Sequence, residues 1–314
     1  MIVVPAPSSY LQGLLRATKY LGIDTQIFAS RTFTLSEKII AGVFNRREMA
    51  SRSLNHRLVI AARKFRPNIV LVMKGENISS ETLNEIKEFG IRTVNWFPDY
   101  INAFELAKKL ANIYDYFFHF DPLAVKNLKK LNLRAKIFCL PFCSDILPND
   151  PKPLSNKYKY KVTFVGNYYP IREEYLKSIA DLGLNIWGDK RWANSVVANC
   201  YRGGQLQNYK FVEVARASKI NVNIQHEYPC EGIVLRPFEV IGAGAFLLTH
   251  NKKDVRRLFK NNVAIFSSPK DLRRKVLYYL GHHIEREQFT NKGYSIVKAK
   301  HTYIHRIREI LSYN

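Results

Sequence analysis

The stretch of sequence that decides the fold starts at Gln225 and ends at Phe246, and it reads Gln-His-Glu-Tyr-Pro-Cys-Glu-Gly-Ile-Val-Leu-Arg-Pro-Phe-Glu-Val-Ile-Gly-Ala-Gly-Ala-Phe. An apolar run at 220–224 precedes it and a second run, at 245–249, overlaps its end. Both runs are typical of buried strands, and residues 237–241 between them are expected to form a short helix. A strand, a helix and a second strand in this order predict a parallel sheet with a helical crossover.

The same alternation of strand and helix patterns runs through the rest of the chain. Further strands are predicted at residues 2–6, 25–29, 68–74, 92–97, 114–120, 136–142, 161–166, 184–187 and 263–266. Residues 190–207 show no clear pattern. A chain of 314 residues is about twice as long as a usual single domain. The sequence therefore predicts an α/β protein with two doubly wound, Rossmann-like domains.

A cluster of prolines divides the two domains. Pro148, Pro151 and Pro153 lie close together among polar residues, and this composition opposes regular structure. We therefore expect an N-terminal domain over 1–147, a linker over 148–159 and a C-terminal domain over 160–298. A last helix over 299–314 is expected to pack back on the N-terminal domain.

The charge balance is strongly basic, at +23, with +8 up to residue 150 (21 basic and 13 acidic residues) and +15 beyond it (28 and 13). Such a charge favours polyanionic partners, although it is also compatible with a simple solvated surface. The four cysteines have no zinc-type or disulfide-type spacing, which indicates free thiols in a reducing compartment. No apolar run approaches the ~18 residues that span a bilayer. We expect a cytoplasmic protein whose membrane contact is peripheral, at the inner face.

Two glutamates of the quoted stretch are candidates for ligand binding. Glu231 and Glu239 are separated by seven residues, a spacing that chance alone produces about once in such a chain. Their context adds weight, because Glu231 and Gly232 follow a strand and precede a helix, where free backbone N–H groups suit a diphosphate. Glu239 would lie near the start of that helix, where its carboxylate can accept two hydroxyls of a ribose.

Four segments carry a resemblance to a known family. Residues 236–249 (Arg-Pro-Phe-Glu-Val-Ile-Gly-Ala-Gly-Ala-Phe-Leu-Leu-Thr) resemble the donor-binding segment of GT-B glycosyltransferases, and more closely that of the spore-maturation CgeB-like branch. Residues 162–172, 184–188 and 301–306 resemble, in order, the opening strand, the second strand and the closing helix of the donor domain. The resemblance covers residues 160–314 well and the first half of the chain only at 95–99, 114–121 and 140–142.

This resemblance implies that a sugar nucleotide lies in a cleft between a donor-binding C-terminal domain and an acceptor-side N-terminal domain. Glu239 would hold the ribose, and Glu231 would lie against the donor sugar as a catalytic residue. The donor-binding set implied by the resemblance comprises Gly166, Asn167, Arg172, Gly188, Glu231, Gly232, Ile233, Arg236 and Glu239. The sequence departs from larger GT-B families after Glu231, where Gly-Ile-Val-Leu-Arg lacks a second glycine.

The chemistry of the leaving group predicts the role of the arginines. Sugar transfer places negative charge on a departing nucleoside diphosphate, and fixed cations or helix N-termini must stabilise it. The chain contains no Asp-x-Asp pair, which metal-dependent transferases use to hold a cation. The sequence therefore predicts a metal-independent enzyme without a cofactor, in which Arg172 or Arg236 offsets the diphosphate.

Three residues of the first half are candidates on the acceptor side. Asp99 follows a predicted strand and could act as general base toward an acceptor hydroxyl, or could instead cap a helix that begins near Asn102. His119 and Asp121 end another strand, and Asp121 is expected to be an N-cap before Pro122.

The basic surface leaves several function classes open. Residues 252–275 contain nine basic and two acidic side chains, a patch suited to an anionic membrane or an anionic, lipid-linked acceptor. The same patch would suit nucleic acid, in a transferase that glycosylates a nucleic-acid base or in a nucleic-acid-binding protein without catalysis. The predicted fold would also suit a sugar-nucleotide epimerase. We expect sugar transfer to a cell-surface glycan or lipid-linked acceptor, with anionic vesicles preferred over DNA.

Overall fold

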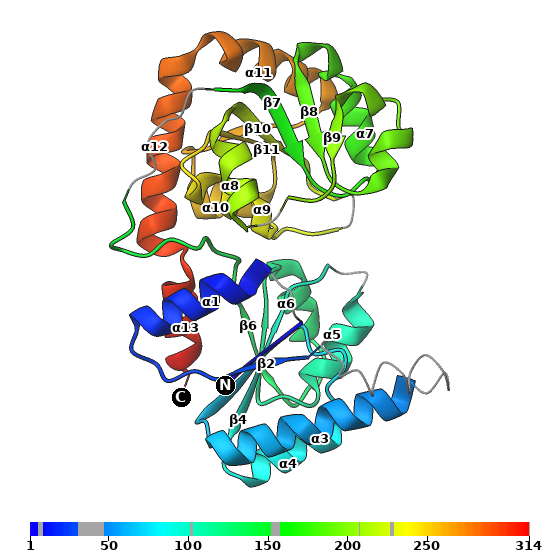
Figure 1. The fold of residues 1–314 in the computed structure, drawn as a ribbon, viewed down its shortest axis with the longest axis vertical. Coiled ribbons are helices and arrows are strands. Elements are labelled where there is room, and N and C mark those ends of the chain that lie inside the picture. Colours follow the sequence, from blue (N-terminus) through cyan, green and yellow to red (C-terminus); the bar gives the residue numbers. More distant parts are fainter. Residues whose placement is uncertain are drawn as a thin grey trace. The chain divides into compact units, whose positions relative to one another are not determined.

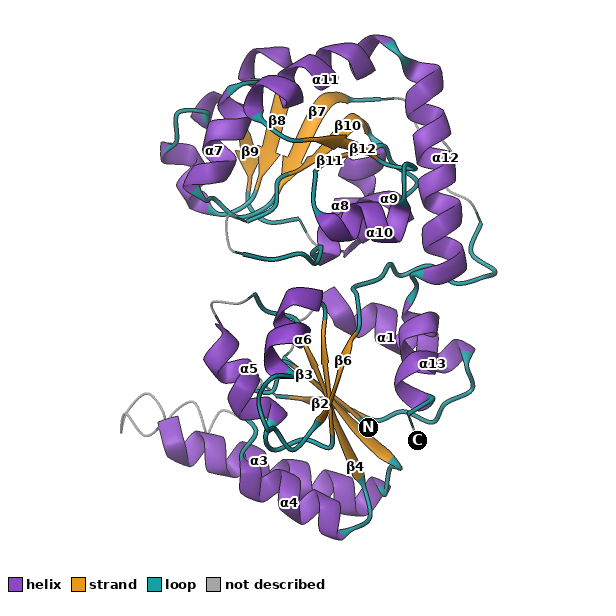
Figure 2. Ribbon diagram, turned by 180° about the vertical axis from the view of Figure 1, so that it is seen from behind, coloured by secondary structure: helices purple, strands orange, loops and turns teal. Residues whose placement is uncertain are grey.

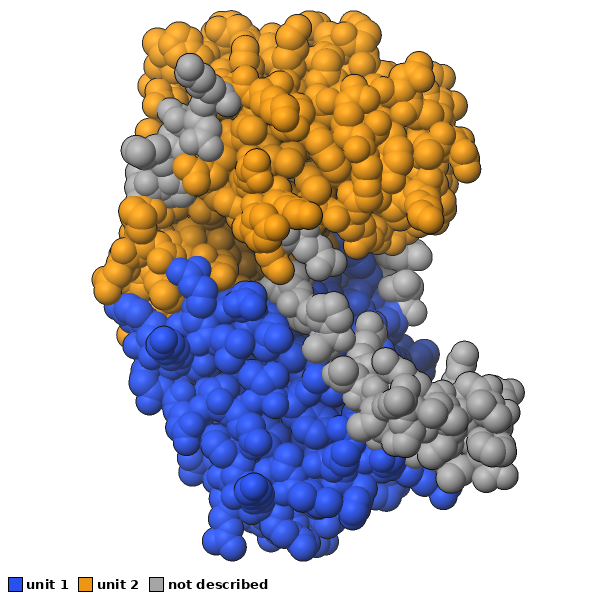
Figure 3. Space-filling view, in the orientation of Figure 1, with its two compact units in different colours: residues 1–141 blue, residues 142–314 orange. Residues whose placement is uncertain are grey.

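The computed structural model describes residues 1–5, 9–30, 47–100, 103–151, 158–206, 208–226 and 229–313. Within them the chain forms two compact units, Met1–Pro141 (unit 1) and Phe142–Asn314 (unit 2), which are coloured separately in Figure 3. The division falls six residues before the end of the N-terminal domain expected from the sequence. Half of the expected linker, at residues 152–157, lies outside the described part, as does Asn102.

Unit 1 is a six-stranded sheet with helices on its faces (Figures 1 and 2). Its strands are β1 (Ile2–Val4), β2 (Ile27–Ala29), β3 (Ile69–Met73), β4 (Arg92–Phe97), β5 (Tyr116–His119) and β6 (Lys136–Cys139). Its helices are α1 (Ser9–Tyr20), α3 (Arg47–Phe65), α4 (Ser80–Glu88), α5 (Phe104–Ala111) and α6 (Pro122–Leu128). All strand pairs are parallel, in the order β2-β1-β3-β4-β5-β6.

Unit 2 repeats this plan with the order β12-β11-β10-β7-β8-β9, again with parallel pairs. Its strands are β7 (Tyr160–Val165), β8 (Leu184–Trp187), β9 (Tyr201–Gly203), β10 (Ser218–Asn223), β11 (Leu247–His250) and β12 (Ala264–Phe266). Its α-helices are α7 (Pro170–Lys177), α8 (Asn208–Arg216), α9 (Leu235–Gly242), α10 (Lys253–Phe259), α11 (Pro269–Gly281), α12 (His283–Lys300) and α13 (Tyr303–Leu311). Short 3₁₀ helices occupy Ala180–Leu182, Lys190–Asn194 and Ala198–Cys200. Helix α13 falls within unit 2, and its packing on the N-terminal domain stays a prediction.

The sequence explains these elements locally. The strand β3 is the apolar run Ile-Val-Leu-Val-Met, as expected for a strand covered on both faces of a parallel sheet. Helices α6, α7 and α11 begin at Pro122, Pro170 and Pro269, where the missing N–H and the fixed φ of proline cost nothing. Asp121 accepts a hydrogen bond from the Leu123 N–H at 3.1 Å, which confirms it as the expected N-cap.

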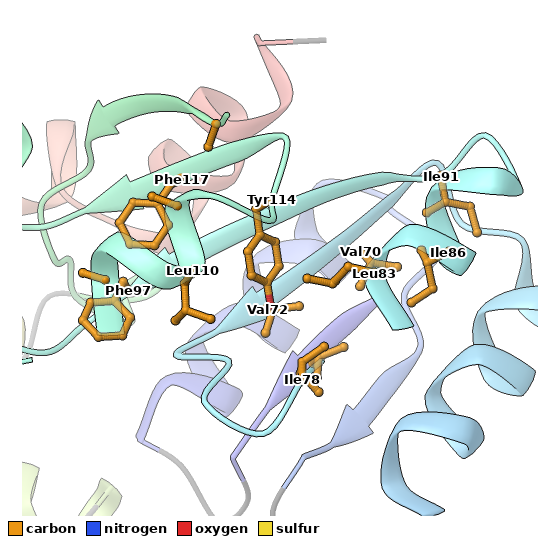
Figure 4. Packing of buried hydrophobic residues seen from close by; sticks show 14 of the residues in the cluster. Val70, Val72, Ile78, Leu83, Ile86, Ile91, Phe97, Leu110, Tyr114 and Phe117 are labelled. Carbon is orange, nitrogen blue, oxygen red and sulfur yellow. The ribbon is translucent and has the colours of Figure 1, made fainter. Parts of the chain in front are cut away.

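Each unit has its own hydrophobic core. In unit 1, buried side chains of β3 and β4 pack against α3, α4, α5 and α6, and Figure 4 shows Tyr114 among them with its hydroxyl beside Val72. In unit 2, one face of β10 packs against α7 and α11, while Asn221 on the opposite face donates to the carbonyl of Ala215 in α8. Among the described helices, none is long and apolar enough to cross a membrane.

Candidate functional site

The strand order of unit 2 reverses direction between β7 and β10. In open parallel sheets this switch point, at the carboxyl ends of the strands, is where ligands bind. Arg172 on α7 lies there: its Nε donates to the Ile224 carbonyl after β10 at 3.1 Å, and its Nη1 donates to the Asn167 carbonyl after β7 at 2.8 Å. These two hydrogen bonds orient the guanidinium without neutralising it. The structure thus brings together Arg172 and Asn167, both of which the sequence places in the donor site.

Gly166 and Gly188 meet at the neighbouring pair of strand ends. A Cβ atom at Gly188 would lie 1.9 Å from the Gly166 carbonyl oxygen, so no larger residue fits. The Trp192 indole donates to the same oxygen at 2.8 Å, and the Gly166 N–H donates to the Trp187 carbonyl at 2.9 Å. The glycines therefore allow the two loops to approach closely, beside the switch point.

Asp189 is a residue of this site that sequence reasoning missed. Its carboxylate accepts from the Tyr168 N–H at 2.8 Å and from the Arg191 guanidinium at 2.9 and 3.1 Å. The Arg191 hydrogen bonds are the main reason that the pKa of Asp189 lies below its usual range. Asp189 thereby fixes the loop after β7 to the loop after β8. It directly precedes residues 190–207, which show no clear strand or helix pattern, and no sequence spacing indicated its hydrogen-bond partners.

Glu231 is tied to the start of α10. Its Oε1 lies 2.5 Å from the Lys253 ammonium, and its backbone carbonyl accepts from the Asp254 N–H at 3.2 Å. The following residues, Gly232 and Ile233, are buried. The Glu231 side chain is one-third exposed, so it remains accessible at the end of the sheet.

Glu239 lies one turn inside α9, where it pairs with Arg236 at 2.8 Å. The Arg236 guanidinium stacks over the ring of the buried Phe211 on α8, with its Cζ 4.1 Å from the ring centroid. Burial raises the pKa of Glu239, and the positive charge of Arg236 opposes this rise. A quarter of each of the two paired side chains is exposed. The carboxylate is therefore partly desolvated and oriented by a cation, as a binding group for hydroxyls would need to be.

Two buried polar residues follow β10 directly. The Nε2 of Gln225 has no hydrogen-bond partner among the described residues, although the side chain is 2% exposed. An unsatisfied buried donor is rare and commonly points to an unseen partner. The His226 ring packs edge-on against Tyr169, with ring centroids 4.1 Å apart, and the Arg172 Cζ lies 4.9 Å from the centroid of that tyrosine ring. Gln225 and Tyr169 carried no sequence signal beyond their position at strand ends.

In unit 1, Asp99 does not cap α5. Helix α5 begins at Phe104, and its N-cap position is Ala103, which has no side-chain hydrogen bond. The helix start that was expected near Asn102 lies outside the described residues. The Asp99 carboxylate pairs with the Lys74 ammonium at 3.1 Å. Its role as a general base stays a prediction.

His119 is buried and holds the loops around Asp99. Its Nδ1 accepts from the Asp121 N–H at 3.0 Å, and its ring also hydrogen-bonds to the Asp99 backbone. Burial lowers the pKa of His119 to about 4, so the ring is neutral at pH 7. His119 thus acts as a structural bridge between the ends of β4 and β5.

The charge of the basic segment 252–275 is more balanced in the structure than its sequence indicates. Five of its nine cations pair with carboxylates, as Lys253–Glu231, Arg257–Asp254, Arg273–Asp181, Arg274–Asp271 and Lys275–Asp271. The spacing of Arg256 and Lys260 predicts that they share a helix face, but this prediction is wrong, because α10 ends at Phe259 and Lys260 has a φ of 54°. Lys270 and Arg274 do share α11.

The described residues contain no group of three or more His, Cys, Asp or Glu side chains that could hold a metal ion. All four cysteines have free thiols.

Comparisons with known proteins agree with this geometry. Residues 172–312 match a family model described as glycosyl transferase-like. No curated protein matches the chain at a significant level.

Solved structures show the fold of the whole chain. The sucrose-phosphate synthase of Thermosynechococcus elongatus superposes with a TM-score of 0.66 at 10% identity, covering 99% of this chain and 98% of that one. HepE from Anabaena in complex with UDP-glucose gives 0.63 at 10% identity, covering 100% and 99%. TarM superposes with a TM-score of 0.57 at 11% identity, covering 82% of this chain. The match spans only 57% of the length of TarM. The chain has the two-domain GT-B fold of glycosyltransferases.

Proposed function

We propose that this protein is a glycosyltransferase that moves a sugar from a nucleoside-diphosphate sugar to an acceptor hydroxyl. The observation that carries the proposal is Arg172, which joins the loops after β7 and β10 at the switch point of unit 2. A guanidinium held there by uncharged carbonyls suits the diphosphate of a donor. The glycosyl transferase-like family match covers this same unit.

Each remaining donor residue has a role in the proposal. Gly166 and Gly188 let the backbone of the loops after β7 and β8 come close to the diphosphate. Asn167 lies in the same loop as Gly166. Glu239, oriented by Arg236, binds the two ribose hydroxyls. Glu231 lies against the donor sugar, and the amides of Gly232 and Ile233 lie near sugar and phosphate. Negative charge that develops on the leaving diphosphate is stabilised by Arg172 and Arg236, so that no divalent metal is required.

The finer identity of the enzyme is also a proposal. We assign it to the CgeB-like branch on the segments 162–172, 184–188, 236–249 and 301–306. Its acceptor is a cell-surface glycan or a lipid-linked glycan, reached by peripheral binding to the anionic inner face of the membrane. The net charge of +23 supports this location. The ion pairs of segment 252–275 neutralise part of its charge and so reduce what this segment contributes to membrane binding.

Calorimetric titration with UDP in the presence of EDTA tests the donor site. UDP is the first probe because HepE holds UDP-glucose. We expect binding with a 1:1 stoichiometry in EDTA and a loss of affinity of about tenfold or more in Arg172→Met, since a charge-assisted contact is removed. The matched control is Arg202→Met, which removes an exposed arginine that bonds Asn185 in the same unit. Binding that appears only with magnesium or manganese would contradict the metal-free mechanism, and no binding of any nucleoside diphosphate would contradict the proposed function.

A further inference from the structure

The chain from the last turn of α6 to the first residue of β6 is strongly basic. Residues 122–141 contain five basic and no acidic side chains. All five basic side chains are exposed, and they form what we call the basic edge of unit 1: Lys126, Lys129, Lys130, Arg134 and Lys136. Helix α6 packs beside β6, the outermost strand on this side of the sheet (Figure 1). The five cations therefore lie together at one end of the sheet's outer edge.

The basic edge is not neutralised by carboxylates. None of its five cations forms an ion pair with another described residue. The carboxylates of the flanking elements contact other groups, because Glu105 on α5 pairs with Lys108 and Asp115 before β5 pairs with Lys87. Asp121 caps the opposite end of α6. The basic edge thus keeps its full positive charge.

Two aromatic rings hold lysines of the basic edge in place. The Lys129 ammonium lies 5.7 Å from the centroid of the Phe138 ring, and the Lys136 ammonium lies 5.7 Å from the centroid of the Tyr116 ring. Such contacts orient a cation without neutralising it. They also occupy one face of each ring, the surface on which a nucleic-acid base would have to stack.

An exposed apolar side chain lies within the basic edge. Leu131 follows Lys130 directly and is 39% exposed, whereas Leu133 packs on the core of unit 1. An exposed leucine among cations suits the boundary between lipid head groups and acyl chains. The phosphates of a nucleic acid offer it no apolar partner. The combination therefore favours a lipid surface over a nucleic acid.

The basic edge lies at the amino ends of the strands, because the loop that carries it leads into β6. All strand pairs of unit 1 are parallel, so the carboxyl ends of β4 and β5 lie at the opposite end of the sheet. His119 ends β5, and Asp99 follows β4 there. A partner bound to the basic edge consequently leaves these carboxyl ends uncovered.

We propose that the basic edge docks the protein on an anionic lipid membrane. Its cations bind the phosphate groups of the lipids, and Leu131 enters the layer below them. The inference rests on the proposed function, because it assigns a surface to the membrane contact of that transferase. Clusters of about four to eight Lys or Arg residues are typical of binding to anionic lipids. Segment 252–275 suits this role less well, since five of its nine cations are paired.

Co-sedimentation of the full chain with lipid vesicles tests this surface. Vesicles of phosphatidylcholine and phosphatidylglycerol in equal parts are compared with vesicles of phosphatidylcholine alone, at low salt and at ~0.15 M salt. We expect binding to the mixed vesicles only, and weaker binding at the higher salt. The triple variant Lys129→Gln, Lys130→Gln, Arg134→Gln should bind about hundredfold more weakly, since each basic residue near an anionic surface contributes about fivefold.

A matched control separates the basic edge from the net charge of the chain. The triple variant Arg256→Gln, Lys260→Gln, Lys270→Gln removes the same charge from exposed positions of unit 2. Its vesicle binding should stay close to that of the unmodified chain. A variant with Lys129→Arg and Lys130→Arg keeps the charge and should keep the binding. Thermal unfolding of each variant establishes that it is folded.

Leu131→Ser distinguishes a lipid partner from a nucleic acid. The change removes an apolar side chain and leaves every charge in place. It should weaken binding to the mixed vesicles about fivefold and leave binding of a DNA duplex unchanged. The same duplex, added as a competitor at ~0.15 M salt, should not release the chain from the vesicles.

The outcomes separate this proposal from the proposed function. Equal vesicle binding by the unmodified chain and the folded basic-edge triple variant, an equal loss in the control, or release by DNA would each overturn the docking surface. UDP binding without vesicle binding would overturn it and leave the transferase standing. The basic-edge triple variant should bind UDP like the unmodified chain. Vesicle binding that depends on the basic edge, without any nucleotide binding, would support the surface and overturn the transferase.

Discussion

In unit 1 the strand order reverses direction between β1 and β3, and Lys74 follows β3 at this switch point. In unit 2 Arg172 lies at the corresponding switch point, between β7 and β10. Two carboxylates contact the ammonium of Lys74, whereas two backbone carbonyls accept hydrogen bonds from the guanidinium of Arg172. The comparison shows that one topology, used twice, surrounds the two cations with different groups: carboxylates in unit 1 and backbone carbonyls in unit 2.

The largest expected difference between the units concerns their glycines. Gly188→Ala would force a Cβ to within 1.9 Å of backbone, while at Gly75 the nearest atoms, 2.8 and 2.9 Å away, belong to side chains. We expect Gly188→Ala to destabilise unit 2 by about 3 kcal/mol or more. Gly75→Ala should destabilise unit 1 by less, because the left-handed φ of 90° costs an alanine about 1–2 kcal/mol and the nearby side chains adjust more easily than backbone. Urea unfolding measures both. Gly204→Ala, with open space around its Cβ, is the control; equal stability of Gly188→Ala and this control would contradict the packing.

A second prediction compares a buried histidine of each unit. Burial lowers the pKa of His119 from 6.5 to about 4, and burial with nearby Arg306 lowers that of His301 to about 3. The unfolded chain takes up these protons first, so this stabilisation is complete above pH 6.5 and is lost as the pH falls through each folded-state pKa. We expect roughly 3 kcal/mol from His119. Stability measured between pH 7 and 4 should fall less steeply in His119→Gln than in the unmodified chain, and parallel curves would contradict the assignment.

Glu239→Gln examines the donor side of the comparison. If Glu239 binds two ribose hydroxyls, the change should weaken UDP binding by about 1.5–3 kcal/mol, the range of charge-assisted hydrogen bonds. Calorimetry measures the affinity, and thermal unfolding establishes that the variant is folded. Glu213→Gln, on the exposed face of α8, is the matched control. A folded Glu239→Gln protein with unchanged UDP affinity would remove Glu239 from the site.

The smallest effect concerns Lys74 at the end of β3, whose φ of 70° lies in the left-handed region. Lys74→Gly relieves the positive φ, whereas Lys74→Ala retains it, and both remove the ion pairs. We expect the glycine variant to be more stable than the alanine variant by about 1 kcal/mol. Denaturant midpoints of the two variants give this difference directly. If alanine were equally stable, the backbone at Lys74 would not be strained.

The sequence predicts the fold better than the site. Strands β4 and β8 occupy the predicted residues because each contains branched and aromatic side chains within an ordinary strand length. Strand β9 was missed, since Tyr201-Arg202-Gly203 has neither alternation nor an apolar run. The resemblance to a family indicated Gly166 and Gly188 as candidates, and position between a strand and a helix indicated Glu239. Lys74 and Asp189 could not be found in this way, because one partner of each, Asp99 and Tyr168, follows a neighbouring strand, and the register of two strands is not visible in their separate sequences.

The edge strands have a consequence for solubility. The outermost strands β2, β6, β9 and β12 contain three or four residues each, as do the inner strands β1, β5, β8 and β11, while β3, β4, β7 and β10 contain five or six. A short edge offers few unpaired N–H and C=O groups to the edge of another molecule. At neutral pH the charge of +23 adds mutual repulsion between copies. Both features protect a concentrated solution of this protein against edge-to-edge aggregation.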